Sequence, residues 1–372
     1  MLGSWPRCCA GSVSGPSDTG LIMTHRRIII SMYFSYVAHS GGVIDVARNV
    51  LAGLKATNAS GYTVREPSAR VTQHKIRTLL RFLADSWLGL RYYFKPVVLL
   101  FPNYFCLPLP GARCRTVVVV HDIMFKHYPA YVSPAKRLIL DVSYRIVQKR
   151  ADGVIFISKD SEQDFIRTYG APRRHTTIYN PVVFKGASPN TVRTVGPQDK
   201  PYVIANFHYY PHKNVEGLLV VFDRLHAAWP ELQLVFTGNC PPQFDELIKN
   251  CKARHAIQHL GFLPKNQVLA VVRDAAAFIS LSKFEGFNMS AAEAALLGKP
   301  LILSDLPVHR ELFTDCARFV SLSDPNVDGS ELSRFVQAYT PVRPSFADQV
   351  SPEQSAERYI SFINKVADSD AS

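Results

Sequence analysis

The sequence predicts an α/β protein with two doubly wound Rossmann-like domains that face each other across a cleft. Short runs of β-branched and other apolar residues alternate with helical periods along most of the chain, which is typical of parallel sheets covered on both faces. One polar segment with proline and glycine, 185–200, interrupts this series and predicts a linker. The length of 372 residues suits two domains that each bury a core of their own.

The first half of the chain contains the elements of an N-terminal domain, which we place at 23–184. Its predicted strands are the runs IIISMYF from Ile28, VVLLF from Val97, TVVVV from Thr116 and GVIFI from Gly153. Between them, apolar side chains recur at helical spacing over 43–57, and 134–150 predicts a longer basic helix. Residues 1–22 are rich in Gly, Ser and Pro and are expected to be a disordered leader, so Met23 is our hypothesis for the native start.

The second half repeats the pattern in a C-terminal domain, which we place at 201–345. Its predicted strands are YVIANF from Tyr202, LQLVFT from Leu232, IQHL from Ile257, AAFISL from Ala276, PLILS from Pro300 and RFV from Arg318. Helices are expected at 214–229, 242–254, 265–275, 290–297 and 329–339. A last helix over 351–367 begins with the capping box SPEQ at Ser351, which has proline at the first helical position.

Glycines and polar side chains lie in the loops that follow several of these strands. Gly41 and Gly42 follow the first strand, His121 ends TVVVV, Lys213 follows YVIANF, and Glu285 follows AAFISL. Ligands of doubly wound sheets bind outside the carboxyl ends of the strands, so we expect these residues to gather at the cleft. Loops at that edge also collect polar residues in the absence of a ligand, which is the alternative interpretation.

The segment EGFNMSAAE places two carboxylates, Glu285 and Glu293, on either side of a turn between a strand and a short helix. We expect Glu293 in the first helical turn, where a carboxylate can accept two hydrogen bonds from a ribose diol. The backbone N–H groups of Asn288 to Ser290 would then offer a seat for a diphosphate. The alternative is an acidic first turn that only favours the helix dipole.

This segment resembles the E-x7-E segment of glycosyltransferase family 4, the retaining transferases of the GT-B fold. GGVIDVARNVLAGL is similar to the glycine loop and helix of that family, VVVVHDIMFKHYP to its HD motif, and HYYPHKN to its lysine loop. The likeness extends from about Arg26 to the C-terminal helix. Within the family it is strongest to mannosyltransferases of O-antigen and capsule synthesis.

The resemblance implies a catalytic set of His121, Lys213 and Glu285. The histidine lies beside the transferred sugar in the family, the lysine binds the donor phosphates, and the first glutamate contacts sugar hydroxyls. The substrate-binding set that it implies is Gly41, Gly42, His208, Phe287, Asn288, Met289, Ser290 and Glu293, with Glu293 on the ribose. It also implies an acceptor-side N-terminal domain, a C-terminal domain that binds the sugar nucleotide, and a last helix that crosses back to the first domain.

Each of these residues also has a simpler interpretation. His121 could be a core histidine satisfied by a carbonyl, Lys213 an exposed loop lysine, and the glycine pair a tight turn. Lys213 precedes Asn214, the expected N-cap of a helix, and a cation there opposes the helix dipole unless an anion lies between them. Many relatives carry an arginine shortly before this lysine. The present chain has none, and His208 or His212 could supply part of that contact if protonated.

The resemblance implies a hexosyltransferase that retains the anomeric configuration and needs neither a protein nucleophile nor a metal. We find no convincing triad or glycosidase-like carboxylate pair in the sequence, and Asp368-Ser369-Asp370 lies in a polar tail. The expected donor is a GDP- or UDP-linked sugar, best guess GDP-mannose, with no other cofactor. The expected acceptor is a glycan or polyprenyl-linked glycan of cell-surface polysaccharide synthesis. The alternatives are an epimerase or a phosphorylase of the same fold, or an inactive sugar-binding relative.

Composition limits the partners and the compartment. The net charge of +12 predicts an anionic partner, but the chain carries no nucleic-acid-binding signature. Seven scattered cysteines predict neither disulfides nor a zinc site, which favours the cytoplasm. No apolar run approaches the ~20 residues of a membrane span. The segment 65–95 has seven basic and two acidic residues around an apolar stripe, so it could lie on an anionic membrane or pack onto the sheet.

Overall fold

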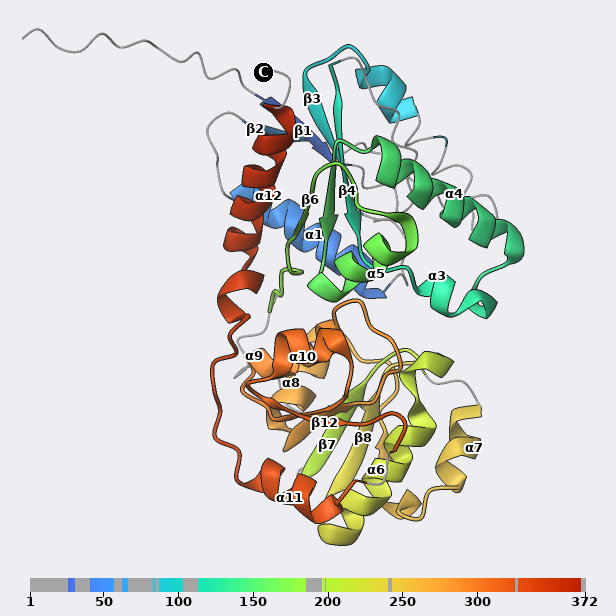
Figure 1. Ribbon diagram of the computed structural model, residues 1–372. Coiled ribbons are helices and arrows are strands. Elements are labelled where there is room, and N and C mark those ends of the chain that lie inside the picture. The colour runs from blue at the N-terminus through green and yellow to red at the C-terminus, as the bar shows by residue number, and fades with distance from the viewer. Residues whose placement is uncertain are drawn as a thin grey trace, which may run out of the picture.

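The computed structural model describes residues 26–30, 41–56, 62–65, 83, 87–102, 113–184, 196–197, 199–239, 243–324 and 327–368. Within these residues, two six-stranded parallel sheets form the centres of two lobes that lie end to end (Figure 1). The predicted GT-B class, with two doubly wound domains, is confirmed. The predicted leader, nearly all of the linker and most of the segment 65–95 lie outside the described residues.

The first lobe contains a sheet with the strand order β2-β1-β3-β4-β5-β6. Its strands are β1 (Arg26–Ile30), β2 (Tyr62–Arg65), β3 (Val97–Phe101), β4 (Arg115–Val120), β5 (Gly153–Phe156) and β6 (His175–Thr177). Its helices are α1 (Gly41–Ala56), α3 (Met124–His127), α4 (Pro134–Arg150) and α5 (Lys159–Tyr169), with a 3-10 turn at Pro129–Tyr131. The valines of β4 are buried on both faces, as a central parallel strand requires. The sequence did not predict β2 and β6, which are short edge strands.

The second lobe contains a sheet with the strand order β12-β11-β10-β7-β8-β9. Its strands are β7 (Tyr202–Asn206), β8 (Gln233–Thr237), β9 (Ile257–His259), β10 (Ala277–Ser280), β11 (Leu301–Ser304) and β12 (Ala317–Val320). Its helices are α6 (Val215–Ala228), α7 (Gln243–Lys249), α8 (Lys265–Asp274), α9 (Met289–Leu296), α10 (Pro307–Phe313) and α11 (Gly329–Gln337). The strand order reverses between β7 and β10, and the loops after these two strands carry Lys213 and Glu285.

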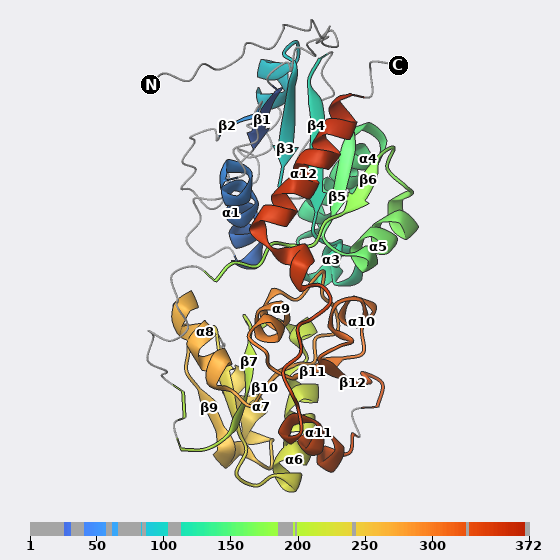
Figure 2. The ribbon, with the colours of Figure 1, turned by 90° about the vertical axis from the view of Figure 1, so that its left-hand side faces the viewer.

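The C-terminal helix α12 (Pro352–Ala367) belongs in space to the first lobe, although it follows the second in sequence (Figure 2). Its N-cap Ser351 accepts a hydrogen bond from the backbone N–H of Gln354 at 3.1 Å. The helix packs against α1, and Gly53 permits this contact because a Cβ atom there would lie 2.5 Å from the carbonyl oxygen of Pro352. Among the described helices, none is long and apolar enough to cross a membrane.

Candidate active site

The structure brings Lys213 and Glu285 together between the lobes. Lys213 ends a 3-10 turn, Pro211–Lys213, that follows β7, and Glu285 lies in the loop after the neighbouring strand β10. The Nζ atom of Lys213 donates to Oε1 of Glu285 over 2.7 Å, and the two side chains are 20% and 11% exposed. The position of Lys213 before a helix predicted an anion beside it. In the structure this anion is the carboxylate of Glu285.

Glu285 is held in its ionised form. Burial alone would raise the pKa of this carboxyl, but the charge and hydrogen bond of Lys213 and a hydrogen bond from Ser282 lower the pKa below its ordinary value. An arriving diphosphate would compete with this carboxylate for the ammonium. The structure thus holds the ammonium and the carboxylate together as an ion pair.

The amino end of α9 lies beside this pair and can receive an anion. Its N-cap Asn288 has φ 67°, and its side-chain oxygen accepts from the backbone N–H of Ala291 at 3.2 Å. The described part of the chain offers no acceptor to the N–H groups of Met289 and Ser290, the first two of the helix. These two donors and the positive end of the helix dipole are suited to a phosphate.

A buried polar network that the sequence analysis missed fixes Asn288. The amide Nδ2 of Asn288 lies 3.0 Å from Nε2 of His309, whose Nδ1 lies 2.8 Å from the carbonyl oxygen of Ser304. Burial lowers the pKa of His309, so the ring is neutral, donates through Nδ1 and accepts through Nε2. His309 lies on the short helix α10, which the sequence did not predict, and no motif marks it.

Glu293 is buried, but not where we expected it. Because α9 begins at Met289 and has Asn288 as its N-cap, Glu293 is the fifth residue of the helix and not part of its first turn. The helix-dipole interpretation therefore does not apply. Its carboxylate pairs with the ammonium of Lys265, the first residue of α8, which the sequence analysis did not select.

His121 has the environment of the simpler interpretation. The ring is buried, and Nε2 lies 2.9 Å from the carbonyl oxygen of Pro102. Burial lowers the pKa of His121, so it is neutral and donates to this carbonyl. Its position at the end of β4 still puts its backbone against the second lobe, because a Cβ atom at Gly286 would lie 2.6 Å from its carbonyl oxygen. A role beside the transferred sugar stays a prediction.

The two lobes meet at Gly286, next to Glu285. A Cβ atom at Gly286 would lie 2.6 Å from the carbonyl oxygen of His121, so no other residue fits without a shift. The carbonyl oxygen of Gly286 accepts from Oγ of Ser158 at 2.8 Å, and the carboxylate of Glu311 accepts from the backbone N–H of Lys159 at 2.8 Å. Loops that follow strands of both sheets therefore contact each other at this point.

His212 does not replace the missing arginine in the way that we proposed, whereas a contribution from His208 stays a prediction. His212 is buried among the rings of Tyr128, Tyr131 and Tyr210. Burial and the charge of Lys213 lower the pKa of His212 to about 4, so it is neutral near pH 7. His208 is exposed, and its ring stacks on Phe262 at a centroid distance of 6.4 Å.

The remaining predicted residues differ in what they can contribute. The side chain of Phe287 belongs to the hydrophobic core and lies 5.9 Å from the ring of Tyr179, so only its backbone can meet a ligand. Ser290 is fixed by a bond from the amide of Asn206 to its Oγ at 3.1 Å. Gly41 and Gly42 begin α1, whose amino end faces the second lobe (Figures 1 and 2).

Two facing doubly wound lobes, with Lys213 and Glu285 in strand-to-helix loops of the second lobe and the buried Glu293 on its helix α9, match the GT-B fold. Residues 49–184 match the model described as Glycosyltransferase Family 4, and residues 191–329 match Glycosyl transferases group 1. The chain therefore belongs to the glycosyltransferases of family 4.

Curated relatives agree with this assignment at low identity. The chain is 24% identical over 321 residues to GDP-mannose:cellobiosyl-diphosphopolyprenol alpha-mannosyltransferase of Xanthomonas campestris, covering 78% of this chain and 82% of the relative. It is 24% identical over 258 residues to O-antigen chain mannosyltransferase RfbU of Salmonella typhimurium, covering 67% and 69%.

Solved structures show the same fold. WaaG, a glycosyltransferase involved in lipopolysaccharide biosynthesis, has a TM-score of 0.62 at 12% identity and covers 92% of this chain and 98% of its own. Sucrose-phosphate synthase from Thermosynechococcus elongatus has a TM-score of 0.60 at 17% identity and covers 92% and 96%.

Proposed function

We propose that the protein is a retaining, metal-independent hexosyltransferase that moves mannose from GDP-mannose to a glycan or polyprenyl-linked glycan in cell-surface polysaccharide synthesis. The observation that carries this proposal is the Lys213–Glu285 pair beside the two free N–H groups of α9. The names of the mannosyltransferase relatives support the sugar and the acceptor class. Among the described residues, no group of three His, Cys, Asp or Glu side chains is arranged to hold a metal ion, and no step of the proposal uses one.

Charge exchange at Lys213 is the first step of the proposed mechanism. The donor diphosphate binds the ammonium and the N–H groups of Met289 and Ser290, and it displaces Glu285. The released carboxylate then accepts hydrogen bonds from hydroxyls of the transferred hexose. Binding of the diphosphate and orientation of the sugar are thus coupled through one ion pair.

The acceptor hydroxyl attacks the anomeric carbon from the face that the diphosphate leaves. The new bond joins the acceptor oxygen to that carbon, the bond from the carbon to the phosphate oxygen breaks, and the acceptor proton passes to the departing diphosphate. Lys213 and the α9 donors stabilise the negative charge that develops, a contribution of about 3 kcal/mol for each well-placed donor. Glu293 accepts from the ribose diol, and Lys265 holds this carboxylate in place.

Membrane association from the cytoplasmic side is the proposed location of the enzyme. Three apolar side chains of the basic helix α4 are exposed: Leu138, Ile139 and Val142. The described members of the 65–95 stripe, Leu83, Trp87 and Leu90, are also exposed and so do not pack onto the sheet. This surface suits an acceptor carried on a polyprenyl diphosphate. Failure of the protein to sediment with phosphatidylglycerol vesicles at low salt would exclude this part of the proposal.

Thermal-shift measurements with GDP-mannose, GDP, UDP-glucose and UDP test the donor. A ligand at 100 times its dissociation constant stabilises a protein by about 2.7 kcal/mol, a clear rise in melting temperature. We expect the largest shift with GDP-mannose, unchanged by EDTA and lost in Lys213→Met.

Transfer to a lipid-linked glycan, with an α-linked product by NMR, would then establish retention. Isomerisation of the donor without acceptor would favour the epimerase, and binding without hydrolysis or transfer would favour an inactive relative.

A further inference from the structure

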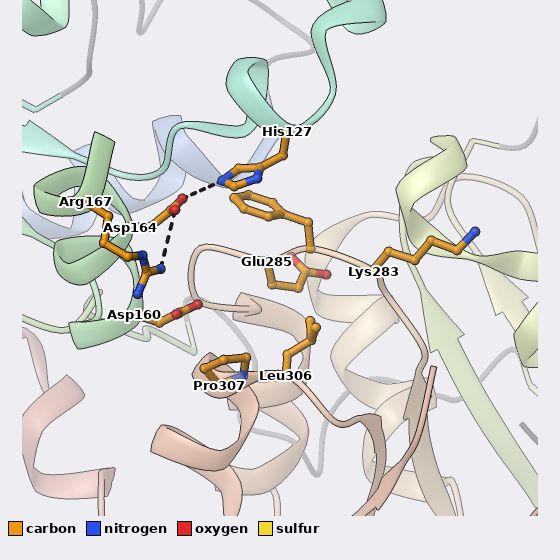
Figure 3. A pocket seen from close by; sticks show the side chains of 9 residues that line it. His127, Asp160, Asp164, Arg167, Lys283, Glu285, Leu306 and Pro307 are labelled. Atoms are coloured by element: carbon orange, nitrogen blue, oxygen red, sulfur yellow. Dashed lines mark hydrogen bonds and ion pairs between the residues drawn. The ribbon is translucent and has the colours of Figure 1, made fainter. Parts of the chain in front are cut away.

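A small pocket of about 160 Å³ lies between the lobes, beside Glu285 (Figure 3). Its first-lobe wall includes His127 of α3 and three residues of α5, and its second-lobe wall includes Phe284 and Glu285 of the β10–α9 loop. Neither Lys213 nor any residue of α9 is among the described residues that line it. The pocket is therefore adjacent to the proposed diphosphate seat but separate from it.

One face of α5 supplies the polar groups of the first-lobe wall. Asp160, Asp164 and Arg167 follow one another at intervals of four and three residues, so they lie on the same side of the helix. Figure 3 shows the three side chains together on one wall of the pocket. Asp164 is fixed by His127, whose Nε2 lies 2.7 Å from its Oδ2, and by Arg167 at 3.5 Å.

Asp160 differs from its neighbours because its carboxylate has no partner in the described part of the chain. Its backbone N–H donates to Glu311 at 3.0 Å, but no described group donates to the side chain. Burial and the carboxylates of Asp164 and Glu311 raise the pKa of Asp160. A ligand hydroxyl can take the place of solvent as the hydrogen-bond donor to this carboxylate.

The charges around the pocket select the class of ligand. Of the three carboxylates that line it, Asp164 pairs with Arg167 and Glu285 pairs with Lys213, which leaves Asp160 without a counter-charge among the described residues. Lys283 also lines the pocket, but its side chain extends away from the others in Figure 3. This balance disfavours a phosphate group and favours a neutral ligand rich in hydroxyls.

Size and surface chemistry narrow the class further. The volume is below the roughly 300–1,000 Å³ of pockets that enclose drug-sized ligands, so it suits one ring and not a nucleotide. The polar wall does not suit a prenyl chain. The ring of Phe284, held against His127 at a centroid distance of 5.0 Å, offers one apolar face. A pyranose has the same combination of hydroxyl edges and an apolar face.

We propose that this pocket is a subsite for a sugar unit of the acceptor, with Asp160 and Arg167 binding its hydroxyls and Phe284 packing on its ring. The proposal rests on the transferase function proposed above. The acceptor is favoured over the donor hexose because the pocket excludes Lys213 and α9, where the donor diphosphate would bind. Glu285 lines both spaces, so it would lie between the two sugars.

Ligand-observed NMR with simple glycosides tests the subsite. The probes are methyl α-D-mannopyranoside, methyl β-D-glucopyranoside and methyl N-acetyl-β-D-glucosaminide, added to the full-length protein saturated first with GDP and then with GDP-mannose. We expect at least one glycoside to bind in both states. We expect Asp160→Asn and Arg167→Met each to weaken that binding about tenfold, the effect of losing roughly one charged hydrogen bond.

Asp245→Asn is the matched control, because Asp245 lies in the first turn of α7 and is exposed far from the pocket lining. It should bind glycosides as the wild type does. The subsite would be overturned if Asp160→Asn and Arg167→Met bound the glycosides as tightly as the wild type does. It would also be overturned if the wild type bound none of them. Displacement of the glycoside by intact GDP-mannose, but not by GDP, would assign the pocket to the donor hexose and overturn the acceptor assignment. The nucleotide thermal shift is a separate readout, so a failed subsite and a failed transferase assignment remain distinguishable.

Discussion

The strand ends of the second lobe are internally paired, whereas those of the first lobe leave a carboxylate unpaired. In the second lobe, Lys213 holds Glu285, and His309 holds Asn288. In the first lobe, the Asp160 carboxylate has no donor among the described residues. The carboxylates of Glu285 and Asp160 line the same pocket between the lobes, so the difference lies within one region of the molecule.

This contrast separates two ways of preparing a binding site. A paired site is already oriented before the ligand arrives, and binding exchanges one partner for another at small reorganisation cost. An unpaired acceptor depends on the ligand for its hydrogen bond and therefore discriminates against ligands that lack a donor. The proposed donor side follows the first pattern, and the proposed acceptor side follows the second.

The largest effect is expected from removal of the Lys213 ammonium, which belongs to the paired site of the second lobe. We expect Lys213→Met to lower the transfer rate about 10²–10³-fold, the usual effect of losing one preorganised donor at a developing charge. Lys252→Met is the control, because this lysine is exposed and is not among the described residues that line the pocket. Initial rates with radiolabelled GDP-mannose measure both. Similar losses in the two variants would show that general positive charge, and not the specific pair, supports the reaction.

The next largest effect is expected from substitution of the buried His212, which should change how the free energy of unfolding depends on pH. Its folded pKa of about 4 lies below the unfolded value of about 6.5, so the unfolded chain binds a proton first as the pH falls. Above about pH 6.5 the neutral ring makes its full contribution to the free energy of unfolding. This contribution decreases as the pH falls from about 6.5 to about 4, by roughly 3 kcal/mol in total. Urea unfolding at pH 7, 5.5 and 4.5 should show a shallower decline for His212→Phe than for the wild type.

His208→Phe is the matched control for that experiment. It makes the same change four residues before His212, but on an exposed ring. The control should keep the pH dependence of the wild type. A parallel change in both variants would mean that the loop, and not the buried ring, causes the slope.

The fold and the central pair of the site could be predicted because they follow from rules of position. Continuous apolar runs mark the buried parallel strands, and the switch-point rule brings the loops after β7 and β10 together, with Lys213 and Glu285 on them. The edge strands β2 and β6 were missed because short strands with one neighbour need no apolar run.

The partners of the site residues could not be predicted in the same way. Periodicity places Lys265 at the start of a helix, but only the packing of α8 beside α9 shows that its ammonium reaches Glu293. The burial of His212 likewise depends on tyrosines from the other lobe, Tyr128 and Tyr131, which no local pattern reveals. Contacts between lobes are long-range properties, and a single sequence carries little trace of them.

The smallest expected effect comes from a comparison of Asn288 and Asn214, which tests how much the hydrogen bonds of Asn288 stabilise the second lobe. Both are N-cap residues in the left-handed region, at φ 67° and 53°. Only Asn288 accepts a hydrogen bond from its helix and bonds to His309, whereas the side chain of Asn214 makes no cap bond. Glycine tolerates positive φ, so substitution by glycine removes the side chain without backbone strain.

We therefore expect Asn288→Gly to lower the free energy of unfolding by about 1–3 kcal/mol, because the cap is lost and His309 keeps a buried acceptor without a donor. Asn214→Gly should change it by less than about 0.5 kcal/mol. Urea unfolding at pH 7 measures both. If the two variants were equally stable, the buried network would contribute nothing beyond the backbone conformation, and the second lobe would be no more preorganised than the first.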